Sequence, residues 1–239
     1  MKCLEIAVFN IESAIAAEKF GADRIEFCEN ATEGGTTPSY GSLTTLKKNL
    51  SIPIFPIVRP RGGDFLYSST EFEVMKYDIE IIKDLGYEGI VMGILYDNGS
   101  LDYKKNKKLI YLAYPLEVTL HRAFDRTNNP IQSLEIAVDC GFQRILTSGQ
   151  VPNAFNGISL IKELIEKADD RIIIMPGSGI RSSNAKQLMN ETGAKEIHSS
   201  ARILINSAMK FNQPLMQEKL ESAFVDETEI KLLSKIVHE

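Results

Sequence analysis

The sequence predicts an α/β fold, an eight-stranded parallel (β/α)8 barrel, from three observations. Short apolar runs with the composition of strands alternate with amphipathic stretches of helical length along all 239 residues. Eight such pairs would take about 30 residues each, close to the size of barrels of this type, the TIM barrels, which have about 250 residues. A short motif also repeats at four of the predicted helix-to-strand junctions.

The predicted strands are short and rich in Ile, Val, Leu and Phe. Runs of this length that are bounded by turn residues are typical of strands in a parallel sheet covered by helices. In chain order the predicted strands are Leu4–Val8, Arg24–Cys28, Pro53–Arg59, Gly89–Gly93, Leu116–His121, Arg144–Thr147, Arg171–Met175 and Glu196–Ser199.

The predicted helices lie between these strands and carry apolar residues at the spacing of one helix face. The last of them closes the chain after the eighth strand. In chain order the predicted helices are Ile11–Phe20, Tyr40–Asn49, Glu71–Leu85, Asp102–Leu112, Ile131–Cys140, Gly157–Ala168, Ser182–Thr192 and Glu227–Val237.

The repeated motif reads Gly-x-x-x-Ile and begins at Gly21, Gly86, Gly141 and Gly193. The isoleucine of each copy lies at the start of a predicted strand. Glycine is favoured just past a helix end because that residue often needs a positive φ. Successive copies are two strand–helix units apart, so helices one, three, five and seven are expected to end alike, as in a barrel built from repeated pairs.

No linker, low-complexity tract or charge block divides the chain, so we expect one domain over residues 1–239. The long irregular stretch is predicted at Ala201–Asp226, as a loop that covers the barrel mouth or joins a subunit contact. An open, doubly wound sheet is the main alternative fold. It is disfavoured because the turn after the first strand, Phe9-Asn10-Ile11, lacks the glycines of a dinucleotide-binding turn.

The net charge and the cysteines of the sequence limit which binding partners and which cellular compartment are expected. A net charge of −5 gives no general attraction for nucleic acid or acidic lipid, and no segment reaches the roughly 20 apolar residues of a membrane helix. The N-terminal run is interpreted as a strand rather than a signal peptide. Cys3, Cys28 and Cys140 show no Cys-x-x-Cys spacing, which favours a reducing cytoplasm over a disulfide framework or a structural zinc site.

Alternation along the strands turns several ionisable side chains toward the barrel axis. Side chains two positions apart share a face of a strand, so the aliphatic residues face the helices and the polar ones face inward. Burying such charges costs several kcal/mol each unless they are paired, so they form structural ion pairs or serve a function. The expected inward-facing residues are Glu5, Ala7, Arg24, Glu26, Cys28, Thr119, His121, Glu196 and His198.

Two groups of rim residues indicate an anion site. The third predicted strand runs into Arg-Pro-Arg-Gly-Gly-Asp, whose arginines can grip a carboxylate or phosphate by paired donors. Turns with glycine and serine follow strands seven and eight, where barrels of this type hold phosphate. The expected ligand-binding residues are Arg59, Arg61, Gly177, Gly179, Ser199 and Ser200.

Acid–base residues occur at the same rim, where the catalytic residues of such barrels lie. The expected catalytic set is Glu26, Arg59, His121 and Asp125, for a reaction of lyase, isomerase or hydrolase type. No lysine lies at the carboxyl end of a predicted strand, which disfavours Schiff-base chemistry. The side chains of Glu26, His121, Asp125 and His198 could also serve as oxygen and nitrogen ligands of a divalent metal ion.

Six runs of the sequence resemble the CutC family of copper homeostasis proteins. The resemblance covers almost the whole chain and implies a cytoplasmic TIM barrel that handles copper and forms a homo-oligomer, with a dimer favoured. The runs are GADRIEFCENATEGGTTPSYG (21–41), IVRPRGGDF (57–65), HRAFD (121–125), RILTSGQ (144–150), IIMPGSGI (173–180) and IHSSA (197–201).

Copper is implied by the resemblance alone, and Cys28, His121 and His198 are the candidate ligands. Some members of the family carry cysteine where Ala7 and Leu66 stand here. Because Cu(I) prefers sulfur ligands, these departures count against a thiolate copper site. Two functions stay open: copper binding and homeostasis, and an enzyme that acts at the rim on a small anionic ligand, phosphorylated metabolites included.

Overall fold

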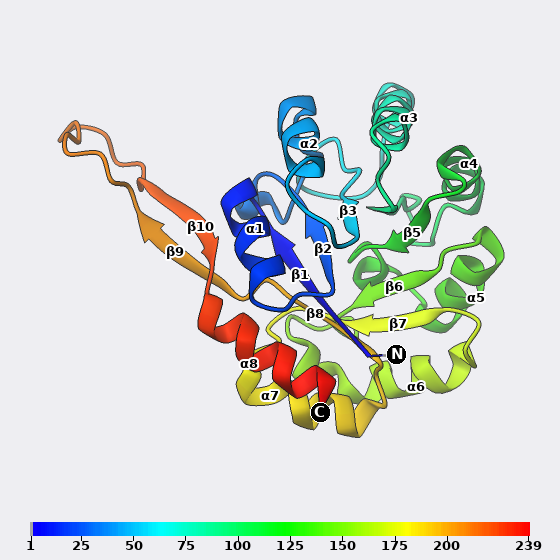
Figure 1. The fold of residues 1–239 in the computed structure, drawn as a ribbon. Helices are drawn as coiled ribbons and strands as arrows, with labels where there is room; N and C mark the ends of the chain where they lie inside the picture. Colours follow the sequence, from blue (N-terminus) through cyan, green and yellow to red (C-terminus); the bar gives the residue numbers. More distant parts are fainter. Residues whose placement is uncertain (1) are drawn as a thin grey trace.

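The computed structural model describes residues 2–239 and confirms the predicted TIM-barrel-like α/β architecture (Figure 1). Short parallel strands alternate with helices, and the helices lie outside the strands. The strands are β1 (Cys3–Val8), β2 (Arg24–Phe27), β3 (Ile54–Pro56), β4 (Gly89–Met92), β5 (Glu117–Leu120), β6 (Arg144–Thr147), β7 (Ile173–Pro176) and β8 (Glu196–Ser199).

The strands form two four-stranded parallel sheets, in the orders β3-β2-β1-β8 and β4-β5-β6-β7. Single parallel bridges join the sheets at both edges, between Ile57 and Val91 and between Gly177 and His198. The strands therefore follow one another in sequence order around the axis. Their carboxyl ends meet at one rim, where residues from distant parts of the chain come together.

The helices begin and end within a few residues of the predicted positions. They are α1 (Ile11–Lys19), α2 (Tyr40–Lys47), α3 (Ser69–Asp84), α4 (Tyr103–Ala113), α5 (Pro130–Cys140), α6 (Ile158–Ala168), α7 (Ser182–Thr192) and α8 (Glu227–His238). Short 3₁₀ turns, η1 (Ala31–Glu33), η2 (Phe124–Arg126) and η3 (Ala154–Gly157), follow β2, β5 and β6 at the rim.

Several boundaries differ from the prediction by one to three residues, and two of them have a clear local reason. Helix α3 begins at Ser69 rather than Glu71, because Ser68, one residue before the helix, forms a capping box with Glu71 in its first turn. Strand β3 ends at Pro56 rather than Arg59, because beyond it only the bridge from Ile57 continues the pairing.

The glycine repeat ends alternate helices as predicted. Gly21, Gly86, Gly141 and Gly193 all have positive φ, at 103°, 76°, 98° and 77°. An L-residue rarely adopts this backbone conformation, which explains why the same residue type recurs at these four junctions.

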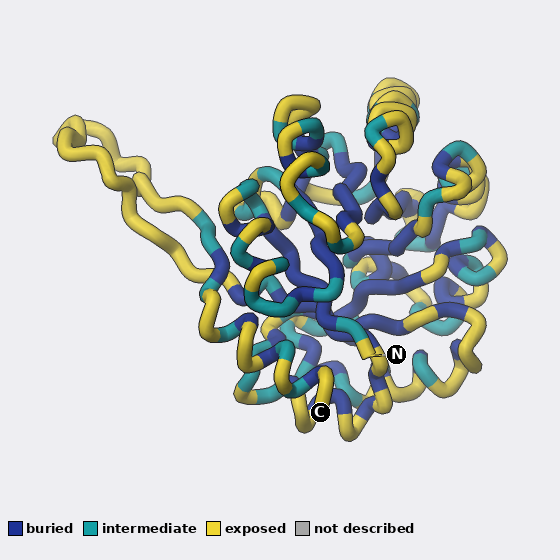
Figure 2. Tube along the Cα trace, in the orientation of Figure 1, coloured by how far each residue is buried: buried dark blue, intermediate teal, exposed yellow. Residues whose placement is uncertain are grey.

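Both faces of the strands are buried (Figure 2). The aliphatic face packs under the helices, where Ile25 and Phe27 are 0% and 1% exposed. The axial face is also buried but polar, since Glu5 and Glu26 are 0% and 5% exposed. The buried axis therefore needs charge pairing, because an unpaired buried charge is costly.

The structure corrects the prediction of an irregular loop at Ala201–Asp226. Strands β9 (Arg202–Asn206) and β10 (Glu221–Val225) pair antiparallel there. With the turn between them they form a hairpin that projects from the barrel (Figures 1 and 2), and we call residues 202–225 the arm. The sequence signal was weak because β9 lacks strict alternation and residues 207–220 separate it from its partner, too many for a tight-hairpin signature.

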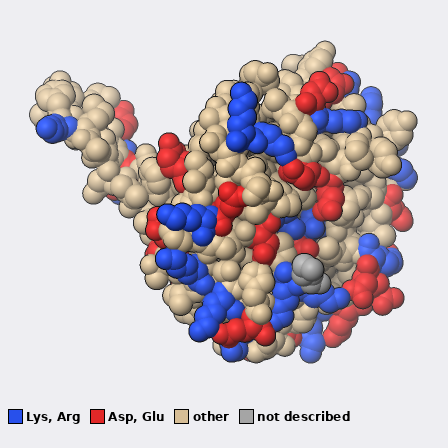
Figure 3. Space-filling model, in the orientation of Figure 1, with Lys and Arg blue, Asp and Glu red and all other residues tan. Residues whose placement is uncertain are grey.

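The surface drawn in Figure 3 mixes lysine and arginine with aspartate and glutamate over the barrel, while the arm is mostly uncharged. Within residues 2–239 no helix combines the length and the apolar character needed to cross a membrane.

Candidate active site

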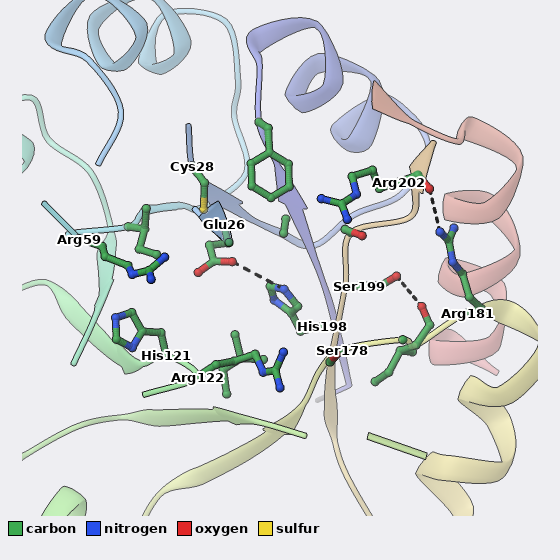
Figure 4. Close-up of a pocket in the computed structure, with 18 of the residues that line it drawn as sticks. Glu26, Cys28, Arg59, His121, Arg122, Ser178, Arg181, His198, Ser199 and Arg202 are labelled. Atoms are coloured by element: carbon green, nitrogen blue, oxygen red, sulfur yellow. Dashed lines mark hydrogen bonds and ion pairs between the residues drawn. The ribbon is translucent and has the colours of Figure 1, made fainter. Parts of the chain in front are cut away.

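A cavity of about 430 Å³ opens at the rim formed by the carboxyl ends of the strands (Figure 4). Most of the predicted site residues line it. They are Glu26, Cys28, Arg59, His121, Gly179, His198, Ser199 and Ser200. The predicted site residues Arg61, Asp125 and Gly177 do not line the cavity.

A buried ion-pair network lies deeper along the axis. Arg24 donates to Glu5 at 2.5 Å and to Glu196 at 2.6 Å, and Arg144 donates to the same Glu196 oxygen at 2.6 Å. Burial alone would raise the pKa of Glu5, but the charge of Arg24, the hydrogen bond and charge of His198 and the charge of Arg144 together outweigh burial and hold that pKa well below its usual range. The two arginines and the two glutamates neutralise one another's charges. They therefore act as structural ion pairs that support the cavity.

His198 connects this network to the cavity. Its Nδ1 lies 2.8 Å from Oε1 of Glu5, and its Nε2 lies 3.6 Å from Oε2 of Glu26. Burial raises the pKa of Glu26 to about 7, although the charge of His198 opposes that rise. Burial would lower the pKa of His198, but the hydrogen bond to Glu5 and the charge of Glu26 outweigh burial and raise it. The pair can therefore exchange a proton near neutral pH.

Cys28 lies beside this pair as a neutral thiol. Its side chain lines the cavity but is only 2% exposed. Burial, assisted by the charge of Glu26, raises the pKa of the Cys28 thiol well above its usual range. A protonated sulfur is a poor nucleophile and a poor metal ligand.

His121 follows β5 and reaches the cavity from another side. Its Nδ1 accepts a hydrogen bond from the backbone N–H of Ala123 at 3.2 Å. Its ring packs against Phe65 with 4.7 Å between the ring centroids. Burial, assisted by the charge of Arg59, lowers the pKa of His121 to about 3, so the ring is neutral at physiological pH.

The structure separates the two arginines that follow β3. Arg59 lines the cavity, but its guanidinium donates to the carbonyl oxygens of Glu33, Gly35 and Gly63 at 2.7–2.9 Å. It therefore braces two rim loops while its charge stays at the cavity. Arg61 points away and pairs with Glu71 at 2.5 Å, so the structure does not bring it to the predicted anion site.

Asp125 positions other residues instead of facing the cavity. It accepts hydrogen bonds from Thr147 Oγ1 at 2.5 Å and from the backbone N–H of Ser148 at 3.0 Å. It also accepts from Arg122 Nε at 2.7 Å, which holds that arginine at the cavity. Asp125 thus acts on the site through Arg122.

The turns after β7 and β8 form the mouth of the cavity. Ser178 and Gly179 have positive φ, at 84° and 71°, which exposes a tight turn of backbone. Ser199 donates its hydroxyl to the carbonyl of Ile180 at 2.7 Å and so ties the two turns together. Gly177 lies behind the mouth, where an added Cβ would stand 2.4 Å from a methyl of Leu146.

Three arginines at the mouth were not predicted as site residues: Arg122, Arg181 and Arg202. Arg181 donates to the carbonyl oxygen of Arg202 at 2.8 Å, which links α7 to the base of the arm. The sequence did carry a signal for these three arginines, because each follows the carboxyl end of a strand or the turn after it. The spacing alone could not show which of the rim arginines turn toward the cavity.

A family model described as the CutC family matches residues 2–203 of the chain. The chain belongs to the CutC family. A copper homeostasis protein cutC homolog from Homo sapiens is 48% identical over 208 residues, which is 87% of this chain and 76% of the human one. A CutC family protein from Parabacteroides distasonis is 46% identical over 227 residues, 93% of each chain.

Solved structures agree with the fold. The crystal structure of a copper homeostasis protein CutC from Streptococcus agalactiae has a TM-score of 0.80 at 33% identity and covers 84% of this CutC family chain and 99% of its own. Phosphoribosylanthranilate isomerase from Thermotoga maritima has a TM-score of 0.61 at 14% identity, over 100% and 99% of the two chains. At that identity the likeness concerns the barrel fold alone.

The residues of this CutC family member do not form a ready-made copper site. Within residues 2–239 no group of three or more His, Cys, Asp or Glu is arranged to hold a metal ion. Cys28 supplies sulfur at the cavity only as a protonated thiol. Cys140 lies elsewhere, at the end of α5, with its sulfur 3.7 Å from the carbonyl of Tyr103. The soft ligands that Cu(I) prefers are therefore not gathered at the rim.

Proposed function

We propose that this CutC family member is an enzyme that transfers a proton on a small anionic metabolite bound at the barrel rim. The observation that carries the proposal is the 3.6 Å contact between His198 and Glu26 in a cavity that four arginines line. A carboxyl group whose pKa is about 7 populates both protonation states near neutral pH. Such a group suits general acid or base catalysis.

The charges at the mouth favour an anionic ligand. Asp125 neutralises Arg122. Arg181 and Arg202 donate to backbone carbonyl oxygens and form no ion pair within residues 2–239. Uncompensated positive charge therefore lies beside the Ser178–Gly179 turn. A carboxylate or phosphate could accept hydrogen bonds from the arginines and from the backbone of this turn.

Glu26 is the proposed proton carrier. Glu5 stays ionised because of Arg24, and it holds the His198 ring at 2.8 Å. A protonated His198 favours the carboxylate form of Glu26, which can then accept a proton from the ligand. Arg59 adds positive charge at the cavity while its own hydrogen bonds keep it fixed.

Binding of inorganic phosphate tests the anion site. Isothermal titration should show phosphate binding to the wild type, and weaker binding to R181M and R202M. A loss of about tenfold or more is expected in each, because hydrogen bonds to charged groups contribute about 1.5–3 kcal/mol. R61M is the matched control, since Arg61 is paired with Glu71 outside the cavity. Equal binding in all four proteins would contradict the proposal.

Copper handling is a second candidate function. It is favoured by the placement of a sulfur, Cys28, in the same cavity as His121 and His198. Binding there would require metal to displace the thiol proton and the rings to move closer. In a chelator competition with Cu(I), C28S should lose most of the affinity, and C140S should keep it. Unchanged affinity in C28S would remove Cys28 from any copper site.

We also propose a cytoplasmic location. Cys3, Cys28 and Cys140 are all free thiols, a state that reducing compartments maintain. Cell fractionation with a specific antibody tests this, and recovery in an oxidising compartment would contradict it.

A further inference from the structure

His121 carries a buried nitrogen without a hydrogen-bond partner. The residue is 4% exposed, and its ring lines the cavity. The backbone N–H of Ala123 donates to Nδ1, whereas Nε2 has no partner. Because Nδ1 is an acceptor, a neutral ring must carry its proton on Nε2. An unpaired buried donor at the wall of a ligand cavity is a group that a ligand can satisfy.

The surroundings of the ring prevent it from acting as a base. Phe65 packs on the His121 ring, and the guanidinium carbon of Arg59 lies 5.0 Å from the centre of the Phe65 ring. Burial and this positive charge keep the pKa of His121 at about 3. A neutral ring whose Nδ1 is already occupied can only donate, from Nε2. Neutral histidine donors polarise carbonyl groups in enolisation reactions.

We propose that the Nε2–H of His121 donates to a carbonyl oxygen of the substrate. This assigns the substrate class: a small metabolite that carries a phosphate or carboxylate at one end and a carbonyl next to a C–H bond. The inference deepens the proposed function and rests on it. Glu26 at the end of β2 and His121 after β5 stand at the same cavity (Figure 4), so one compact molecule can contact both.

The step balances without a further reactant. The carboxylate of Glu26 removes the proton from the carbon beside the carbonyl. The electron pair of that C–H bond becomes a C=C bond, and the carbonyl π pair moves onto oxygen. His121 stabilises the enolate oxygen through its Nε2–H, and protonated Glu26 then returns the proton to a carbon of the enolate.

The tautomer can be measured directly on the wild-type protein. In ¹⁵N-edited NMR of the full chain, we expect His121 to stay neutral between pH 5 and pH 8, with the proton on Nε2 and none on Nδ1. A ring protonated on Nδ1, or one that gains a second proton within this range, would overturn the inference.

A binding experiment separates this inference from the proposed function. A hydroxamate that carries a phosphate ester mimics an enolate and should bind the wild type tightly. H121L should lose about 100-fold in affinity for it, as expected when an oxyanion donor is removed, and keep its affinity for inorganic phosphate. H121Q is the matched variant, because its amide can still donate. If phosphate itself does not bind the wild type, both proposals fail. If phosphate binds and H121L holds the hydroxamate as tightly as the wild type, this inference alone fails.

Discussion

Nε2 of His198 on β8 lies 3.6 Å from Oε2 of Glu26 on β2, although 172 residues separate them. The barrel brings them together because β1 pairs with both β2 and β8. Glu5 on β1 holds the other nitrogen of the same ring at 2.8 Å. Three adjacent strands thus supply one buried chain of titrating groups that ends at the cavity.

Glu26 should make stability fall as pH rises. Its pKa is about 7 in the folded protein and near 4.5 when unfolded, so the folded state binds more protons between these values. As pH rises from about 4.5 to about 7, the contribution of the Glu26 carboxyl to the free energy of unfolding is therefore lost. The loss is up to about 1.4 kcal/mol per pH unit. E26Q should lose less stability than the wild type in urea unfolding between pH 5 and pH 8.

The exposed carboxyl of Glu80 provides the control for this experiment. E80Q should follow the wild-type pH dependence. If E26Q also follows it, the carboxyl of Glu26 titrates normally, and its assignment as the proton carrier is wrong.

His121 should have the opposite effect, on the acid side. Its pKa is about 3 in the folded protein and near 6.5 when unfolded, so the unfolded state binds the extra proton between these values. Stability is therefore lost as pH falls from about 6.5 toward 3. Relative to the wild type, H121Q should lose less stability between pH 6.5 and pH 4.5, measured by urea unfolding. A slope in H121Q equal to that of the wild type would contradict the neutral ring.

The axial ion pairs should be far more costly to break than surface pairs. R24M removes the shared partner of Glu5 and Glu196 and leaves their buried charges under-compensated. Such losses cost about 3–5 kcal/mol. Lys195 pairs with Asp170 at 3.0 Å on the surface, where both side chains are more than half exposed, so K195M should cost less than about 1 kcal/mol. Equal urea midpoints for the two variants would show that the axial network does not support the barrel.

The fold was accessible from the sequence because it depends on local signals. Alternating periodicities placed every barrel strand and helix, and the glycine at each Gly-x-x-x-Ile junction proved to have positive φ. The arm was not accessible, since its strands pair across residues 207–220 and no tight-turn signal joins them.

The site could be predicted from the sequence only in part. Strand alternation gives the direction in which a side chain points, but it does not say which residue that side chain will contact. It placed Glu26, His121 and His198 on the axis, and all three line the cavity. It could not show that Arg61 turns toward Glu71 in the helix that follows. It also could not show that the carboxylate of Asp125 accepts hydrogen bonds from Arg122 and from the turn after β6. Those contacts depend on side-chain rotamers across the rim.

The mouth turn offers a prediction with a closely matched control. Gly179 and Gly86 have similar φ values, 71° and 76°, so alanine at either position should cost about 1–2 kcal/mol of stability from backbone strain. Their surroundings differ. A Cβ at Gly179 would stand 2.1 Å from Nδ2 of Asn153, whereas one at Gly86 meets nothing within 4 Å. G179A must therefore push the Asn153 side chain and the turn that edges the cavity apart, whereas an alanine at Gly86 displaces no neighbouring atom. We expect both variants to unfold at lower urea concentrations than the wild type, G179A at the lower of the two, and only G179A to bind phosphate several-fold more weakly in isothermal titration. If the two variants bind phosphate alike, the Ser178–Gly179 turn does not contact the anion, and Arg122, Arg181 and Arg202 would have to hold it without the backbone.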